Sequence, residues 1–336
     1  MKTRRAARGR VEIIEHVSRA LHGNRLGDPY IRDVPVYLPP GYEDSKARYP
    51  VLFCLAGFTG AGQSHLAWKG WGESLPDRLD RLIGAGSMGP TIVVMPNCFT
   101  KLGGSQYINS SVSGRYDDYL IEELVPLVDS RFRTKAGREH RGVFGKSSGG
   151  FGAIVQGMLH PEVWGALACH SGDSYFEFCF LSDLPRSLNL INRAGGVGPY
   201  LAEFARKKKR SNGDVHAVMH LAMAACFDPQ PSHPDGFELP VDLRTGRLKP
   251  ERWANWLRWD PVRMIPDHVK ALKSMKELFV DCGDRDQYHL HFGSRQMSEE
   301  LTRARIKHRY EEFSDNHSSI GYRMDVSLPL LWRALR

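Results

Sequence analysis

Cysteine is scarce in this sequence, and apolar runs of membrane length are missing. The chain has six cysteines in 336 residues, and no two form a CxxC pair, which disfavours a disulfide scaffold or a zinc ribbon and indicates a reducing compartment. No uncharged apolar stretch reaches the roughly 18 residues that a membrane-spanning helix needs. The basic N-terminus is not followed by the apolar segment of a signal peptide. We therefore expect a cytoplasmic protein that does not insert into a membrane.

Acidic residues are absent from the first ten positions, and this absence locates the net charge. The chain carries 46 Lys and Arg against 38 Asp and Glu, a formal charge of +8. Five cationic residues lie in residues 1–10 and five more in the run 206–210, which together carry a charge of +10. The rest of the chain therefore has a net charge of −2. We expect residues 1–10 to form a flexible basic tail. A nucleic-acid-binding protein is an alternative, but no nucleic-acid motif accompanies the basic segments, so no such partner is expected.

Short apolar runs separated by helical patterns predict the fold class. Helical periodicity occurs at 117–132, 150–160 and 295–305. Alternating apolar and polar residues, typical of strands, occupy 11–17 and 31–38. Such an alternation of strands and helices predicts a mostly parallel sheet with helices on both faces. The runs that fit strands buried on both faces are 50–57, 91–95, 141–145, 166–169 and 277–281.

The segment from about 174 to 265 interrupts this alternation. It contains the basic run, proline-rich residues 229–240, and a tryptophan cluster (Trp253, Trp256 and Trp259) that is more typical of core packing than of a ligand platform. We expect one domain over residues 11–336, with this segment as a cap-like insertion over one end of the sheet.

Residues 145–149, Gly-Lys-Ser-Ser-Gly, match the pattern G-x-S-x-G. An apolar strand precedes the pattern and a glycine-rich helix start follows it, which is the setting of a nucleophile elbow. The hydroxyl of Ser147 would then project from the top of the sheet. Ser148 is the neighbouring alternative, but it occupies a variable position where its backbone N–H is the more useful group. The other interpretation is a Gly/Ser-rich loop that has no catalytic role.

A serine hydroxyl becomes a nucleophile when a histidine base takes its proton and an acid orients that histidine. In proteins with a nucleophile elbow, the acid comes after the serine in the sequence, and the histidine comes last. His317, the last histidine, stands in a polar turn before the final helix, and His308 is the competing candidate. Asp281, Asp284 and Asp286 follow the last apolar run. We favour Asp286 because it lies on the loop beyond the strand, whereas Asp281 ends the strand.

A tetrahedral intermediate also needs backbone N–H donors for its oxyanion. Ser148 supplies one candidate donor. The second is expected in the glycine-rich loop 56–60, with Phe58 as the candidate and Gly57 as the next choice. An ordinary turn at the end of a strand is the alternative.

With these residues in place, the chain resembles the esterase D branch of the α/β-hydrolases, which includes S-formylglutathione hydrolases, feruloyl esterases and enterochelin esterases. The resemblance covers roughly residues 11–173 and 265–335. It implies an α/β-hydrolase fold and cofactor-free hydrolysis of an ester or thioester through an acyl-enzyme. It places Ser147, Asp286 and His317 on the triad positions and Phe58 and Ser148 on the oxyanion positions, while Ala56 stands where members often have His. The motifs that carry the resemblance are VYLPPGY at 36–42, LAGF at 55–58, GKSSGG at 145–150, HP at 160–161, HSG at 170–172, GDRD at 283–286, and His317.

Other polar residues are expected near the catalytic edge of the sheet. Residues 103–109, which include Tyr107, resemble a phosphate loop only superficially and are expected to line the rim. Asp173 and Glu177 follow the fourth apolar run, so they are candidates for substrate contacts or for helix capping. Gly57 is the fourth candidate for a substrate contact. His289 and His291 could be metal ligands, but no third ligand is spaced nearby, so no metal is expected.

These features predict a serine carboxylic-ester hydrolase that acts on a small-molecule ester without a cofactor. An acyltransferase with the same triad and an alcohol acceptor is the first alternative. A hydrolase fold that has lost catalysis and serves as a scaffold is the second. The sequence leaves the acyl group, the leaving group and an oligomeric state open.

Overall fold

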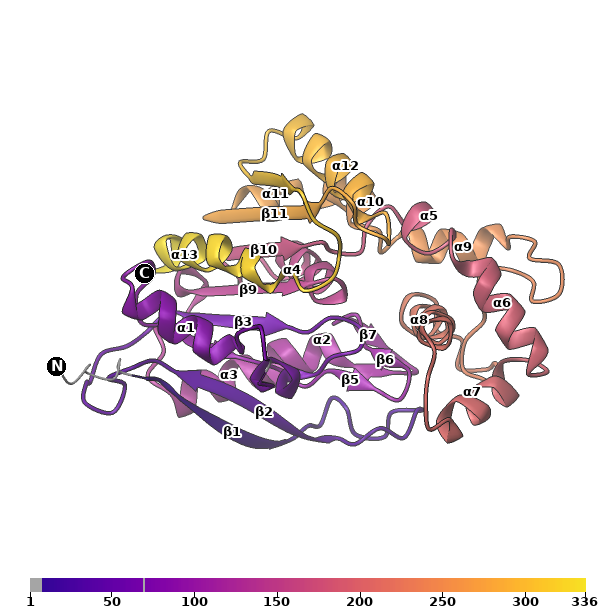
Figure 1. The fold of residues 1–336 in the computed structure, drawn as a ribbon, viewed down its shortest axis with the longest axis horizontal. Helices are drawn as coiled ribbons and strands as arrows, with labels where there is room; N and C mark the ends of the chain where they lie inside the picture. The colour runs from indigo at the N-terminus through magenta and orange to yellow at the C-terminus, as the bar shows by residue number, and fades with distance from the viewer. Residues whose placement is uncertain (1–7, 69) are drawn as a thin grey trace.

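The computed structural model describes residues 8–68 and 70–336, and its centre is one eight-stranded sheet (Figure 1). The strand order is β1-β2-β4-β3-β9-β10-β11-β12. Strand β2 is antiparallel to both of its neighbours, and every pair from β4 to β12 is parallel, as the alternating pattern predicted. The strands are β1 Arg10–Val17, β2 Ile31–Leu38, β3 Val51–Leu55, β4 Ile92–Val94, β9 Arg141–Lys146, β10 Ala166–His170, β11 Glu277–Gly283 and β12 Arg309–Phe313.

The central strands are apolar throughout because both faces of the sheet are covered. All five residues of β3 are buried, and successive side chains point to opposite faces. Phe53 belongs to the larger apolar core on one face, together with Ile154. Leu52 belongs to a smaller core on the other face, together with Leu79 and Leu331. Burial on both sides explains why these runs lack polar alternation.

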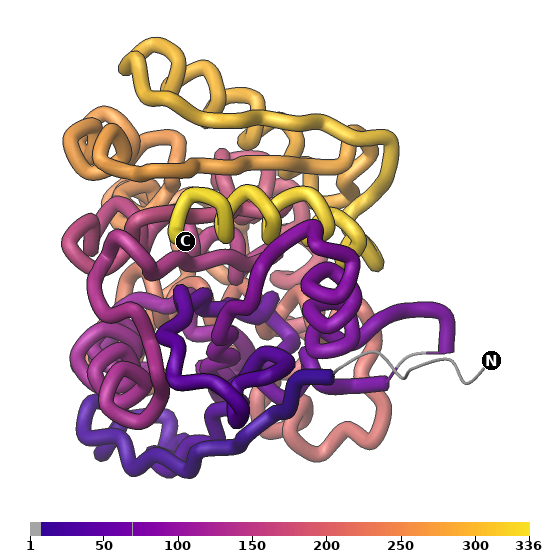
Figure 2. Tube along the Cα trace, turned by 90° about the vertical axis from the view of Figure 1, so that its left-hand side faces the viewer, coloured from indigo at the N-terminus to yellow at the C-terminus, as the bar shows by residue number. Residues whose placement is uncertain are grey.

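Helices cover both faces of the sheet, as expected. The predicted helix at 117–132 is continuous but contains a π-helical stretch, Tyr119–Leu124. Figure 2 shows the yellow C-terminal helix lying across the middle of the molecule, between the orange β11 segment and the indigo N-terminal strands. The main helices outside the segment between β10 and β11 are α1 Leu75–Gly84, α2 Tyr116–Asp118, α3 Val125–Arg131, α4 Ser148–Leu159, α12 Leu290–Arg303 and α13 Met324–Leu335. Two small two-stranded ladders, β5 Phe99–Thr100 with β6 Gly103–Gly104 and β7 Asn109–Ser110 with β8 Gly114–Arg115, lie between β4 and α2.

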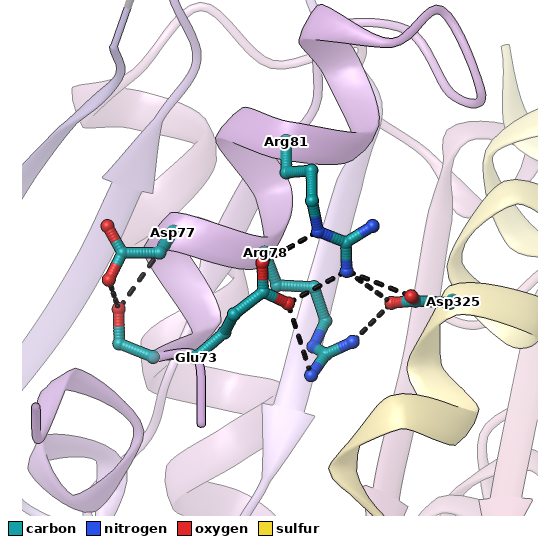
Figure 3. A network of polar contacts seen from close by, with 6 residues as sticks. Glu73, Asp77, Arg78, Arg81 and Asp325 are labelled. Carbon is teal, nitrogen blue, oxygen red and sulfur yellow. Dashed lines mark hydrogen bonds and ion pairs between the residues drawn. The ribbon is translucent and has the colours of Figure 1, made fainter. Parts of the chain in front are cut away.

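A network of charged side chains fastens α1 to α13 (Figure 3). Arg81 donates to Glu73 at 2.6 Å and to Asp325, at the start of α13, at 2.8 Å. Arg78 also pairs with Asp325. The hydrogen bond from Arg81 lowers the pKa of the Glu73 carboxyl. The network therefore joins two helices on the same face of the sheet that are far apart in the sequence.

The segment between β10 and β11 is helical. Figure 1 shows α6, α7 and α8 gathered at the end of the molecule toward which β3 points. Trp253 and Trp256 are buried, and the Trp256 ring lies 5.7 Å from that of Phe227, so these two tryptophans pack in the core as expected. The helices are α5 Phe176–Cys179, α6 Leu184–Arg193, α7 Val197–Arg206, α8 Asn212–Phe227, α9 Pro250–Leu257, α10 Pro261–Met264 and α11 Val269–Lys273.

Residues 9 and 10, which were predicted to belong to the basic tail, are part of the fold instead. Strand β1 begins at Arg10, whose guanidinium donates to Glu43 at 2.9 Å. The backbone N–H of Gly9 donates to Asp80 at 2.8 Å. These bonds make residues 9 and 10 part of the fold, while residues 1–7 lie outside the described residues.

Candidate active site

Ser147 occupies a sharp turn between β9 and α4. Its backbone has φ 59° and ψ −128°, a conformation that a side chain with a Cβ seldom adopts and that is typical of a nucleophile elbow. The Ser147 N–H donates to the carbonyl of His170, at the end of β10, at 2.9 Å. A Cβ on Gly149 would lie 2.0 Å from the carbonyl oxygen of Leu55. The flanking glycine is therefore required because β3 passes directly beside the helix start.

His317 and Asp286, the predicted base and acid, contact each other. His317 Nδ1 lies 2.7 Å from Asp286 Oδ2, and both residues are buried, at 6% and 2% exposure. The other carboxylate oxygen of Asp286 accepts from the Tyr288 N–H at 2.9 Å. The backbone N–H of His317 donates to the side-chain oxygen of Gln287 at 3.0 Å. An Nδ1–H that donates to the carboxylate leaves Nε2 as the acceptor for a serine proton.

The competing residues are engaged elsewhere. Asp281 is paired with His170 at 2.7 Å and with Arg323 at 2.8 Å. Asp284 faces its neighbour Arg285. His308 is hydrogen-bonded to Ser298 at 3.0 Å. Among the candidates, the structure thus brings together Asp286 and His317.

One cavity of about 480 Å³ connects the candidates. Ser147 and His317 both line it, together with Gly57, Phe58 and Asp173. Three further lining residues, Val215, His216 and Met219, come from α8. The helical segment between β10 and β11 therefore closes one side of the cavity that contains Ser147.

The loop expected to hold the oxyanion passes close to the serine. A Cβ on Gly57 would lie 3.5 Å from the Ser147 Cβ, which is ordinary van der Waals contact, so the loop lies directly beside the serine. The Gly60 N–H donates to the Gly57 carbonyl at 2.9 Å, which closes a turn around Phe58. The Phe58 ring packs against Gly103, where a Cβ would meet it at 2.4 Å.

Tyr107 and Glu177 do not line this cavity, in contrast to the expectation. Tyr107 is 3% exposed, and its hydroxyl donates to the carbonyl of Ala56 at 2.5 Å, so it supports the candidate oxyanion loop without facing the cavity. Glu177 lies in the first turn of α5 and forms an ion pair with Arg263 of α10. Their positions do not support a contact with substrate.

Asp173 does line the cavity and is almost completely buried. Its Oδ2 accepts from Gln106 and from the Ser148 hydroxyl, each at 3.0 Å. Burial raises the pKa of this carboxyl, although the two hydrogen bonds partly oppose the shift. The Ser148 hydroxyl is therefore engaged by Asp173, so it is not directed at the reaction of Ser147.

His216 and Tyr288 are among the lining residues of the cavity that were not identified from the sequence. His216 Nδ1 lies 3.0 Å from Asp183 Oδ2, and its ring lies 5.5 Å from the Tyr288 ring. The Tyr288 ring in turn meets His317 edge-on at 4.8 Å. Helical spacing shows that Val215 and Met219 share a face of α8, but no local signal shows that this face meets the cavity.

The two histidines considered as metal ligands lie at the start of α12. His289 precedes the helix with φ 62°, and His291 is buried within its first turn. Among residues 8–68 and 70–336, no group of three or more His, Cys, Asp or Glu side chains is arranged to hold a metal ion. In the same described part of the chain, no helix combines the length and the apolar character needed to cross a membrane.

Curated relatives match only part of this chain. The chain is 33% identical over 144 residues to the endo-1,4-beta-xylanase/feruloyl esterase of Xylanibacter ruminicola, which covers 42% of this chain and 19% of that protein. It is 32% identical over 140 residues to esterase Rv1288 of Mycobacterium tuberculosis, which covers 41% of this chain and 28% of that protein. The matches thus span less than a third of the relatives' own length.

Solved structures match the whole fold, and a family model matches most of the chain. A ferulic acid esterase superposes with a TM-score of 0.62 at 20% identity, covering 98% of this chain and 99% of that one. An S-formylglutathione hydrolase from Agrobacterium tumefaciens gives 0.60 at 16% identity, covering 99% and 98%. These similarities confirm the α/β-hydrolase fold. Because residues 29–326 match the family described as "Putative esterase", the chain belongs to that esterase family, as its motifs indicated.

Proposed function

We propose that this chain is a serine carboxylic-ester hydrolase that acts through an acyl-enzyme. The observation that carries the proposal is the buried pair of His317 and Asp286, because His317 lines the same cavity as Ser147. Membership in the esterase family supports the reaction class. The names of the relatives, which include feruloyl esterases and S-formylglutathione hydrolases, support an ester or thioester as the bond that is cleaved.

In the proposed first half-reaction, Ser147 Oγ attacks the carbonyl carbon of the ester while His317 Nε2 takes the serine proton. Asp286 holds the imidazole and stabilises its charged form without taking the proton. The backbone N–H groups of Phe58 and Ser148 stabilise the negative oxygen of the tetrahedral intermediate. The intermediate collapses, the bond to the leaving alcohol or thiol breaks, and His317 returns its proton to the leaving group.

In the proposed second half-reaction, water replaces the leaving group. His317 removes a proton from water, and the hydroxide adds to the acyl carbon. Collapse of this second intermediate releases the carboxylic acid and restores the Ser147 hydroxyl with the proton held by His317. Transfer to an alcohol would use the same groups, and analysis of the products with an added alcohol separates hydrolysis from transfer.

Hydrolysis of a short aryl ester tests the proposal. Ser147→Ala should lower kcat by about 10³-fold or more, because the nucleophile and its base act as a unit. Ser148→Ala is the matched control, since it keeps the backbone N–H and should retain most of the activity. Wild-type turnover by Ser147→Ala would contradict the proposal. The cytoplasmic location and the lack of a nucleic-acid partner stay predictions from the sequence.

A further inference from the structure

A second cavity, of about 310 Å³, adjoins the cavity of Ser147. Phe58, Thr59 and Val215 line both cavities. Phe58 belongs to the loop beside the serine, and Val215 belongs to α8. The two cavities therefore share a boundary between the candidate oxyanion loop and the helical segment.

The lining of this second cavity combines aromatic rings with positive charge. Phe58, Phe99 and Phe204 supply the rings, and Lys101 and Arg210 supply the charge. The other lining residues are Thr59, Leu102, Gly103, Val215 and Val218, so no carboxylate of the described residues lines the cavity. An apolar surface with two cations complements an apolar arm that ends in an anion.

The two cations are held by contacts with neutral groups of the protein. Lys101 Nζ donates to the carbonyls of Leu26 and Gly27 at 2.8 and 3.0 Å, so neutral backbone groups position the ammonium. The Asp28 carboxyl is close enough for the charge of Lys101 to oppose the rise of its pKa that burial causes. The Arg210 guanidinium lies 4.7 Å from the centre of the Phe204 ring.

A neighbour in the same basic run differs in this respect. Lys207 pairs with Glu203 at 2.9 Å and with Asp214 at 2.7 Å, so its charge is balanced within the protein. Arg210 lines the second cavity instead. The basic run of the sequence therefore includes both a structural cation and one that is available to a ligand.

We propose that this second cavity is a subsite for an anionic group, such as a carboxylate, which is joined to the scissile ester through an apolar arm. Arg210 and Lys101 bind the anion, and the three phenylalanine rings contact the arm. The inference rests on the proposed esterase function and narrows its substrates to esters that carry a negative charge away from the reacting bond.

Two pairs of esters test the subsite from either side of the scissile bond. The acyl pair is mono-4-nitrophenyl adipate and its methyl ester. The leaving-group pair is the acetate of 3-(4-hydroxyphenyl)propionic acid and the methyl ester of that compound. Wild type should favour the charged member of at least one pair in kcat/KM. Arg210→Gln and Lys101→Gln should each lower that preference about tenfold, because each removes a charge-assisted hydrogen bond to the anion. The change should appear as a higher KM for the charged ester, while the kinetics of the neutral ester stay the same.

Lys209→Gln is the matched control, because it removes the same charge from the same run at a residue that lines neither cavity. It should leave the preference unchanged. Equal preference in wild type and Arg210→Gln, or no preference for charge in either pair, would overturn the subsite while leaving the esterase function intact.

A binding measurement tests the subsite without turnover. Calorimetry should show that 3-phenylpropionate binds Ser147→Ala more tightly than it binds the double variant Ser147→Ala, Arg210→Gln, with a difference that shrinks as salt is raised. Equal affinity for both variants, or no binding to either, would overturn the subsite. Failure of wild type to hydrolyse all four esters would instead count against the proposed function.

Discussion

At the residue scale, the candidate site depends on a few side chains whose environments differ. Asp286 is buried against an imidazole and a backbone N–H, so its carboxylate is well placed to orient His317. Asp173 is also buried in the cavity, but its partners are the neutral Gln106 and Ser148. Asp286 contacts His317, which lines the cavity, whereas Asp173 lines the cavity itself. The two carboxyl groups therefore have different expected roles, which are orientation of the base for Asp286 and contact with substrate for Asp173.

Asp286→Asn should lower kcat by about 10³- to 10⁴-fold, because an amide can hold the imidazole in the wrong tautomer. Asp284→Asn is the matched control on the same loop and should have little effect, since Asp284 faces Arg285 at the surface. The measurement is kcat for an aryl ester at a pH where wild type is fully active. Similar losses in both variants would contradict the assignment of Asp286.

Asp173 should make the stability of the fold depend on pH. Its pKa is raised by burial, so as pH rises above the ordinary value of 3.8 the unfolded state loses its proton first. The native state then binds more protons, and stability falls as pH rises toward the raised value. Urea unfolding at pH 4 and pH 7 should show that wild type loses stability relative to Asp173→Asn. A parallel response of the two proteins, or a relative gain by wild type, would contradict this.

At the element scale, the contact between β3 and the start of α4 fixes the turn that carries Ser147. Gly149→Ala should destabilise the protein by about 1–3 kcal/mol, because the new Cβ meets the backbone of Leu55, which cannot move cheaply. Gly84→Ala is the matched control, since nothing lies within 4 Å of a Cβ at that position in α1. It should be neutral or stabilising by up to about 1 kcal/mol. Thermal or urea unfolding of both variants gives the comparison, and equal effects would contradict the close approach.

The charged network between α1 and α13 also acts at the scale of elements. Asp325→Asn removes the shared partner of Arg78 and Arg81 and should cost about 0.5–1 kcal/mol, because the network is partly exposed. Glu300→Gln, which removes a simple pair with Arg303 within one helix, should cost less. Urea unfolding at low and high salt measures both changes. A larger effect of the Glu300 variant would contradict a joining role for the network.

At the scale of the whole molecule, the sequence predicted what depends on local pattern and chain order. Apolar runs identified the parallel strands, and the G-x-S-x-G pattern with its strand and helix identified the turn at Ser147. The order serine, acid, histidine selected Asp286 and His317, which the fold places together. By contrast, Tyr107 reaches Ala56 from below the loop, and His216 reaches the cavity from α8. Such contacts depend on how distant elements pack, for which the local pattern holds no signal.

The helical segment between β10 and β11 shows the same limit. Its composition indicated an insertion over one end of the sheet but not which of its residues face the cavity. The fold places Val215 at both cavities and Arg210 at the second. The net charge of the chain, which first suggested a polyanionic partner, is thereby connected through one arginine to the proposed substrate.

Fluorophosphonate labelling followed by intact mass and peptide mapping tests the central claim most directly, because this reagent captures an activated serine. The account predicts one label per chain, attached to Ser147, and loss of labelling in Ser147→Ala and in His317→Ala but not in Ser148→Ala. Attachment to another serine, or an unlabelled folded wild-type protein, would contradict the claim that Ser147 is the nucleophile of an esterase.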